Sequence, residues 1–91
     1  MHARVITFNG DHVKEVVKFI DDADKAKLEK AKGIYVLTDL NNEKTMTVSL
    51  WDTKKDLEDS LPAAEEIAKQ ISKDITGMPH QIEIYEVAHQ Y

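Results

Sequence analysis

The order of periodic segments constrains the fold of this 91-residue chain more than any other feature. Four segments alternate apolar and polar residues as strands do, and two stretches repeat apolar residues every three or four positions as amphipathic helices do. The predicted strands cover residues 3–8, 34–40, 44–51 and 81–88. With the helical stretches after the first and third strands, the order is βαββαβ. This order predicts a ferredoxin-like α+β fold, a four-stranded antiparallel sheet with helices on one face.

The first helical stretch has Asp11 as its N-cap and Gly33 as a residue that can terminate it. Its interior contains Asp21, Asp22 and Asp24, and aspartate favours caps and turns over helix interiors. The sequence therefore allows a kink in the helix near these residues, or a break into two shorter helices.

The second helical stretch has Thr53 as its N-cap and contains Pro62. Proline lacks a backbone N–H but is accommodated in the first turn of a helix. We therefore expect a short helix to about Ser60 and a fresh helix from about Pro62 that stops at Gly77.

The two middle strands form a predicted hairpin around Asn41 and Asn42, a pair that tolerates the positive φ angles of a tight turn. This register pairs Asp39 with Lys44, Leu37 with Met46 and Tyr35 with Val48, joining opposite charges and apolar partners. One face of the hairpin is then apolar, and it carries Tyr35, Leu37, Met46, Val48 and Leu50. The reverse face is mixed, and it carries Ile34, Val36, Thr38, Thr45, Thr47, Ser49 and Trp51. Because the helices cover only one face, we expect the mixed face to contact a second copy of the chain.

Composition bounds the class of protein. The length suits one domain, residues 1–91, and the absence of cysteine excludes disulfides, thiolate nucleophiles and Cys-ligated metal. A formal net charge of −5 argues against nucleic acid as a partner. No stretch approaches the roughly 20 apolar residues of a membrane span, and the N-terminus lacks the apolar run of a signal peptide. We therefore expect no membrane partner and a cytoplasmic location.

The segment from Thr47 to Leu57, TVSLWDTKKDL, resembles the strand-to-helix signature of the dimeric α+β barrel superfamily, specifically its antibiotic-biosynthesis-monooxygenase-like domains. In these domains a strand ends in a tryptophan, an acidic or polar cap follows and a charged helix begins. The βαββαβ layout and the length agree over nearly the whole chain. The resemblance implies a homodimer in which two sheets pack into a barrel with the helices outside.

The chain also departs from this superfamily. Many members carry a histidine, or in the haem-degrading branch a tryptophan, at the helix position that is Ser60 here. Haem degraders also use an asparagine inside the first strand and a histidine on the second helix, whereas Asn9 lies at a turn and no histidine occurs from residue 52 to 78. Haem degradation is therefore disfavoured.

Members that are true oxygenases need no cofactor, because the deprotonated aromatic substrate reduces dioxygen itself and the protein supplies a dry pocket and groups that hold the phenolate. The resemblance thus implies a cofactor-independent monooxygenase acting on a small aromatic or quinol-like substrate between sheet and helices. The alternative is a non-catalytic homodimeric small-ligand-binding or interaction module of the same fold. Ser60 and the missing helix histidine favour this alternative.

Candidate substrate-binding residues are Trp51, Tyr35, Tyr85 and His80; no catalytic residue can be assigned. Each has a structural alternative: Trp51 as a packing anchor, the tyrosines as core or interface residues, and His80 as an exposed loop residue.

The remaining histidines, His2, His12 and His89, are too scattered to predict a metal site, and we expect none. The three glycines all lie at the ends of predicted elements, so no phosphate-binding loop is present.

Overall fold

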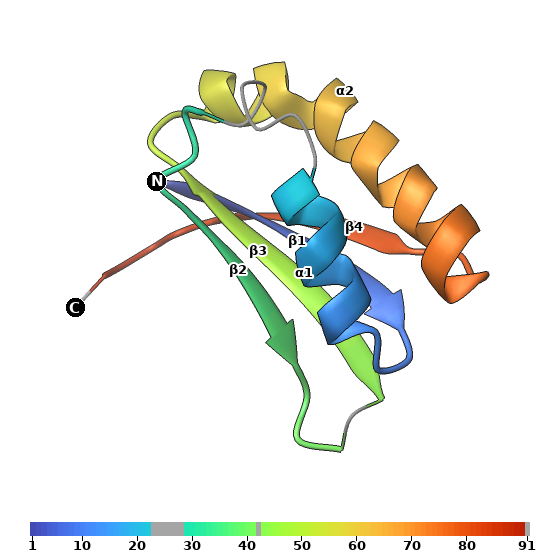
Figure 1. The fold of residues 1–91 in the computed structure, drawn as a ribbon. Helices are drawn as coiled ribbons and strands as arrows, with labels where there is room; N and C mark the ends of the chain where they lie inside the picture. Colours follow the sequence, from blue (N-terminus) through green and yellow to red (C-terminus); the bar gives the residue numbers. More distant parts are fainter. Residues whose placement is uncertain (23–28, 42, 91) are drawn as a thin grey trace.

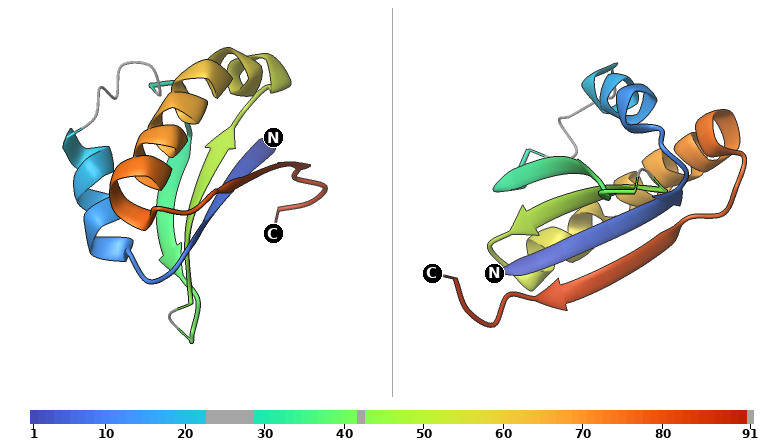
Figure 2. Two further views of the ribbon diagram at one scale, coloured as in Figure 1. Left: turned by 90° about the vertical axis from the view of Figure 1, so that its right-hand side faces the viewer. Right: turned by 90° about the horizontal axis from the view of Figure 1, so that it is seen from below.

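The computed structural model describes residues 1–22, 29–41 and 43–90. Its strands are β1 (His2–Asn9), β2 (Gly33–Thr38), β3 (Lys44–Trp51) and β4 (Gln81–Glu86). Its helices are α1 (Val13–Asp22) and α2 (Lys54–Ile71), and the π-helical turn η2 (Ser72–Thr76) continues α2. The four strands form one antiparallel sheet in the order β2-β3-β1-β4. Both helices lie on one face of it (Figures 1 and 2), which confirms the ferredoxin-like α+β fold.

Helix α1 ends at Asp22, in the aspartate-rich region where the sequence allowed a break. Residues 23–28 lie outside the described residues, and with them the part of the predicted helical stretch that contains Asp24. Ala31 is not helical, and Gly33 begins β2. The prediction that Gly33 terminates the helix was therefore wrong.

Helix α2 continues through Pro62, so the predicted break at this residue was wrong. Thr53 is the N-cap as predicted, and its hydroxyl accepts a hydrogen bond from the N–H of Asp56 at 3.1 Å. Pro62 lies on the exposed side of α2, where the carbonyl oxygen that lacks its N–H partner can bind water instead. The opposite side of α2 is buried, and this packing outweighs one missing hydrogen bond. Gly77 follows η2 at φ +66°, the left-handed conformation expected of a terminating glycine.

The hairpin register is confirmed, because Tyr35 pairs with Val48 and Leu37 with Met46. At the turn, the Asp39 carboxylate accepts hydrogen bonds from the backbone N–H groups of Glu43 and Lys44 at 2.6 and 2.9 Å.

The helices cover the mixed face of the hairpin, which corrects the prediction that this face is open to a second chain. The reason lies in β1, which the hairpin alone does not include. Ile6 and Phe8 of β1 point to the same side, and they form the core with Val16 of α1 and with Ala64, Ala68 and Ile71 of α2. The Thr45 hydroxyl on this side has two partners. Thr45 donates to the carbonyl oxygen of Gly10 and accepts from the N–H of His12, both at 2.9 Å.

No helix of the described residues lies on the opposite side of the sheet, which we call the open face. Because facing residues of antiparallel strands point to the same side, it carries Val5, Tyr35, Leu37, Met46, Val48, Leu50 and Tyr85. Tyr35, Leu37 and Tyr85 are 52%, 45% and 49% exposed in the single chain. The open face is therefore an exposed apolar surface.

Across the parts of the chain that the structure describes, no helix has the length and apolar character needed to cross a membrane. The cytoplasmic location and the absence of a nucleic-acid partner stay predictions from composition.

The continuity of α2 can be tested by replacing Pro62 with alanine. Alanine restores an N–H in the middle of the helix, so we expect Pro62→Ala to raise the free energy of unfolding by about 1–3 kcal/mol in urea titrations. Glu66→Ala, also on the exposed side of α2, is the control and should change it by less than about 0.5 kcal/mol. An unchanged or lower stability of Pro62→Ala would indicate that a new helix begins at this residue.

Candidate functional site

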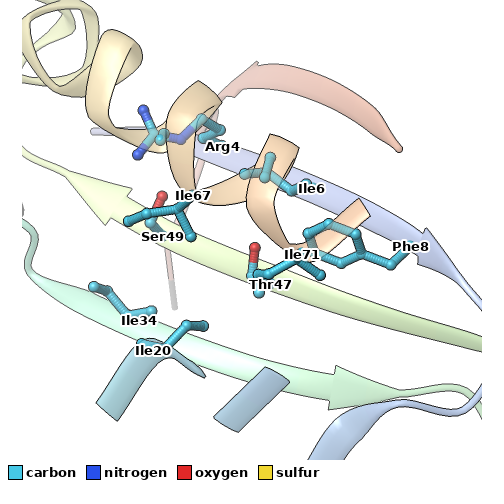
Figure 3. A pocket seen from close by; sticks show the side chains of 11 residues that line it. Arg4, Ile6, Phe8, Ile20, Ile34, Thr47, Ser49, Ile67 and Ile71 are labelled. Carbon is cyan, nitrogen blue, oxygen red and sulfur yellow. The ribbon is translucent and has the colours of Figure 1, made fainter. Parts of the chain in front are cut away.

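A cavity of about 40 Å³ lies between the helix-covered face of the sheet and the two helices. Side chains of β1, β2, β3, α1 and α2 surround it (Figure 3). Its lining consists of Arg4, Ile6, Phe8, Ile20, Ile34, Thr47, Ser49, Ala64, Ile67, Ala68 and Ile71. The walls are thus aliphatic and aromatic apart from one guanidinium and two hydroxyl groups, a composition typical of small-molecule sites.

Arg4 is placed at the cavity by the alternation of β1, which puts residues 4, 6 and 8 on one side of the sheet. It is the only arginine in the sequence. Its side chain is only 3% exposed, and its Nη1 donates to Ser60 Oγ at 2.8 Å and, at 3.4 Å, to the carbonyl oxygen of Leu57. The guanidinium carbon lies 5.1 Å from the centre of the Trp51 ring, in the geometry of a cation–π contact. Its Nε has no hydrogen-bond partner among the described residues.

Burial lowers the pKa of Arg4 from its ordinary value to about 10. None of the ion pairs found between described residues includes Arg4. The site therefore holds a positive charge beside apolar walls without a carboxylate to neutralise it, and a buried charge without a counter-ion is costly. Such a site is electrostatically suited to a ligand that carries a negative charge.

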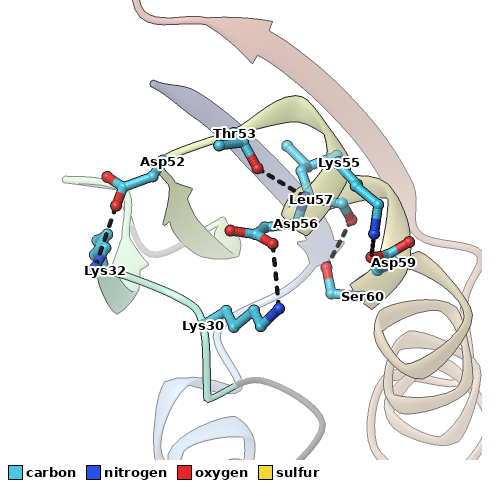
Figure 4. A network of polar contacts seen from close by, with 9 residues as sticks. All are labelled: Lys30, Lys32, Asp52, Thr53, Lys55, Asp56, Leu57, Asp59 and Ser60. Carbon is cyan, nitrogen blue, oxygen red and sulfur yellow. Dashed lines mark hydrogen bonds and ion pairs between the residues drawn. The ribbon is translucent and has the colours of Figure 1, made fainter.

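The first turns of α2 hold the guanidinium in place. Ser60 Oγ donates to the carbonyl oxygen of Leu57 at 2.7 Å while it accepts from Arg4, so its position is fixed from two sides. Ion pairs of Lys30 with Asp56 at 3.6 Å and of Lys32 with Asp52 at 3.2 Å join the segment before β2 to the start of α2 (Figure 4). These pairs are largely exposed and contribute little stability each.

The four candidate residues from the sequence do not converge on the cavity. Trp51 is 1% exposed, and its Nε1–H donates to Ser49 Oγ at 2.9 Å. It packs behind Arg4 and Ser49 and does not itself line the cavity. His80 lies beyond the end of η2, where its Nδ1 is 2.7 Å from Ser72 Oγ. Its ring centre is 6.1 Å from that of Phe8, which itself lines the cavity.

Tyr35 and Tyr85 lie on the open face, on the edge strands β2 and β4. The Tyr85 hydroxyl donates to Glu83 Oε2 at 2.7 Å, and this hydrogen bond raises the pKa of Tyr85. Neither tyrosine lines the cavity between sheet and helices.

Sequence reasoning missed Arg4, although a signal was present. A charged residue in register with Ile6 and Phe8 interrupts the apolar side of a strand, and such an interruption is informative because a buried charge is expensive.

Among the described residues, no group of three or more histidine, cysteine, aspartate or glutamate side chains is arranged to hold a metal ion.

Strand order and helix placement define the fold class as ferredoxin-like α+β. Several solved structures share this fold. No family model matches the sequence, and no curated protein matches it. A Deinococcus radiodurans protein assigned by name to the antibiotic biosynthesis monooxygenases aligns with a TM-score of 0.73 and 14% identity, over 100% of this chain and 96% of its own. A Streptomyces coelicolor monooxygenase, from the gene ActVA-Orf6 and in complex with the ligand Nanaomycin D, aligns with a TM-score of 0.74 and 11% identity. The alignment covers 99% of this chain and 89% of the Streptomyces chain.

A dimeric ferredoxin-like protein from an uncultured marine organism aligns with a TM-score of 0.69 and 7% identity, over 99% of this chain and 90% of its own. These identities show a shared fold. The resemblance to antibiotic-biosynthesis-monooxygenase-like domains is confirmed at that level.

The cost of the buried charge can be measured. Because the pKa of Arg4 is lower in the folded chain than its ordinary value, the charged form destabilises the fold fully below pH 10, and the effect fades as the pH rises above 10. At pH 7 we therefore expect Arg4→Met to leave the free energy of unfolding unchanged or to raise it by up to about 3 kcal/mol.

Ser60→Ala is the matched variant, since it keeps the charge and removes its principal acceptor. We expect it to lower the free energy of unfolding by about 1–3 kcal/mol. If Arg4→Met were instead the more damaging of the two in urea titrations, Arg4 would be a structural residue.

Proposed function

We propose that this protein is a cofactor-independent monooxygenase that oxidises a small aromatic or quinol-like substrate between the sheet and the helices. The observation that carries the proposal is an apolar cavity whose lining contains one buried cation, Arg4. The shared fold with the Streptomyces coelicolor monooxygenase, which binds its ligand Nanaomycin D, supports it.

The chemistry asks little of the protein. A naphthol and dioxygen, for example, give a naphthoquinone and water: one oxygen atom replaces a ring hydrogen as a carbonyl oxygen, and the other leaves as water with two electrons and two protons from the substrate. The substrate supplies the electrons once its hydroxyl is ionised. The protein's share is to exclude water and to stabilise the ionised oxygen, which apolar walls and a fixed cation provide.

Space for the aromatic ring of a substrate can come from the groove beside α1. The cavity of about 40 Å³ holds only a few water molecules. A groove of about 240 Å³ between α1 and β2 shares Ile20 and Ile34 with it. Val16 is the only fully buried residue of α1, so this helix is the more weakly anchored wall. A substrate that enters through the groove displaces α1 outward and joins the two spaces.

The alternative is a non-catalytic homodimeric module that binds a small ligand or a partner. A specific observation favours it: apart from Arg4, none of the described residues that line the cavity has a titratable side chain that could act as a general base. Ser60, at the helix position where the superfamily carries a site residue, is buried and engaged with Arg4 and Leu57.

We also propose that the chain forms a homodimer through its open face. The exposed aromatic and aliphatic side chains of that face support this arrangement, and so does the shared fold with a protein named as dimeric.

Oxygen uptake separates the monooxygenase from the binding module. With a panel of dihydroxynaphthalenes and quinols, we expect protein-dependent consumption of dioxygen that a metal chelator leaves unchanged. Ala68→Leu, which adds bulk to the cavity wall, should remove most of this activity, whereas Ala63→Leu on the same helix, outside the lining, should retain it. Circular dichroism of both variants verifies the fold. No protein-dependent uptake across the panel would leave the binding module as the function.

Native mass spectrometry tests the dimer. Val48 lies centrally on the open face, paired with Tyr35 on one side and Val5 on the other. Val48→Asp places charges in the proposed interface, so we expect the dimer mass to be replaced by the monomer mass at micromolar concentration. Val36→Asp is the contrasting variant, because Val36 packs against the core under the helices. It should lower the stability of the fold without selectively splitting the dimer. A Val48→Asp protein that stays dimeric would refute the open face as the interface.

A further inference from the structure

We propose that Arg4 binds the ionised oxygen of an aromatic anion, a phenolate or an enolate, through the guanidinium N–H groups that have no acceptor among the described residues. This inference rests on the proposed function, because it places the ligand in the same cavity. It adds the charge state of the ligand and the protein group that the ligand contacts.

Among the described residues, the hydrogen bonds of Arg4 engage only Nη1 and leave the rest of the guanidinium to a ligand. Nη1 is committed to Ser60 and to the carbonyl oxygen of Leu57, and the Trp51 ring lies against the guanidinium. These contacts fix the plane of the group, so its N–H bonds point in set directions. Nε is fully buried, carries a hydrogen and has no acceptor among the described residues. A buried donor without an acceptor costs stability unless a ligand supplies one.

Charge selects an anionic acceptor over a neutral one. The guanidinium is desolvated, and no ion pair found between described residues neutralises it. In surroundings of low dielectric constant, an ionised oxygen gains more from this group than a neutral hydroxyl or ether oxygen does. Binding an anion also offsets the destabilisation that the unpaired cation causes in the free protein.

Ser49 offers a second donor beside Arg4. Its Oγ accepts a hydrogen bond from Trp51 Nε1 at 2.9 Å, so its own O–H is directed away from that nitrogen. Because Ser49 lines the cavity, its hydroxyl can donate to the same ligand oxygen. Two donors converging on one oxygen form the arrangement that stabilises an oxyanion.

The walls select the body of the ligand. Most of the cavity lining is aliphatic or aromatic, with Ile6, Phe8, Ile67 and Ile71 among it. A small hydrated anion such as phosphate would leave these walls without contacts and would lose its water. A flat ring with an ionised oxygen at one end satisfies both the walls and Arg4.

The test compares two probes that differ in charge. 2-Hydroxy-1,4-naphthoquinone is ionised at neutral pH, and its 2-methoxy ether has the same ring without the charge. The chain contains no cysteine that could add to either quinone. Isothermal titration calorimetry at pH 7 measures the dissociation constant of each probe for the wild-type protein, for Arg4→Met and for Lys54→Met, a control that removes an exposed cation outside the lining.

We expect the wild-type protein and Lys54→Met to bind the anion at least about tenfold more tightly than the ether. In Arg4→Met the two probes should bind equally, with the affinity for the ether within about twofold of wild type. The wild-type comparison needs no variant, so it decides the charge preference even if Arg4→Met fails to fold.

Three results would overturn the inference, and they differ in what they leave of the proposed function. Equal binding of both probes to the wild-type protein, or an anion preference that survives in Arg4→Met, would remove the role of Arg4 and leave the proposed pocket intact. Binding of neither probe to the wild-type protein would remove the aromatic pocket itself, and with it the proposed function.

Discussion

The buried guanidinium of Arg4 is the interaction on which the rest of the site depends. A positive charge on the core side of a central strand is tolerable only if the surrounding side chains hold it, and here Ser60, the carbonyl oxygen of Leu57 and the Trp51 ring do so. The cap at Thr53 sets where α2 begins and thereby where Ser60 meets Arg4. The first turns of α2 therefore form part of the candidate site.

The two faces of the sheet differ in what they carry. Its helix-covered side holds the core, the cavity and the charge, whereas its open face carries exposed tyrosine and leucine side chains. Dimerisation through the open face would bury these side chains and leave the cavity on the outer side of each sheet. Ligand binding and assembly then use separate surfaces, and a change in one need not disturb the other.

Local patterns predicted the elements well. Alternation located the four strands, and the pairing of Tyr35 with Val48 in the hairpin was correct, because register depends on neighbouring residues. The face of the sheet that the helices cover was predicted wrongly, because it depends on Ile6 and Phe8 of β1, which pair with β3 from a distant part of the chain. The same limit applies to the site: Arg4 and Ser60 meet only after folding.

The central claim is that a ligand anion contacts Arg4 in the cavity, and the sequence allows a direct measurement. Arg4 is the only arginine and Trp51 the only tryptophan, so each gives one assignable side-chain N–H signal in a ¹H–¹⁵N NMR spectrum. On titration with 2-hydroxy-1,4-naphthoquinone, we expect the Arg4 Nε–H signal to shift with saturation and the Trp51 Nε1–H signal to change less, while the backbone N–H signal of Tyr85 at the sheet edge stays in place. An unmoved Arg4 signal, with shifts confined to residues of the open face, would contradict it.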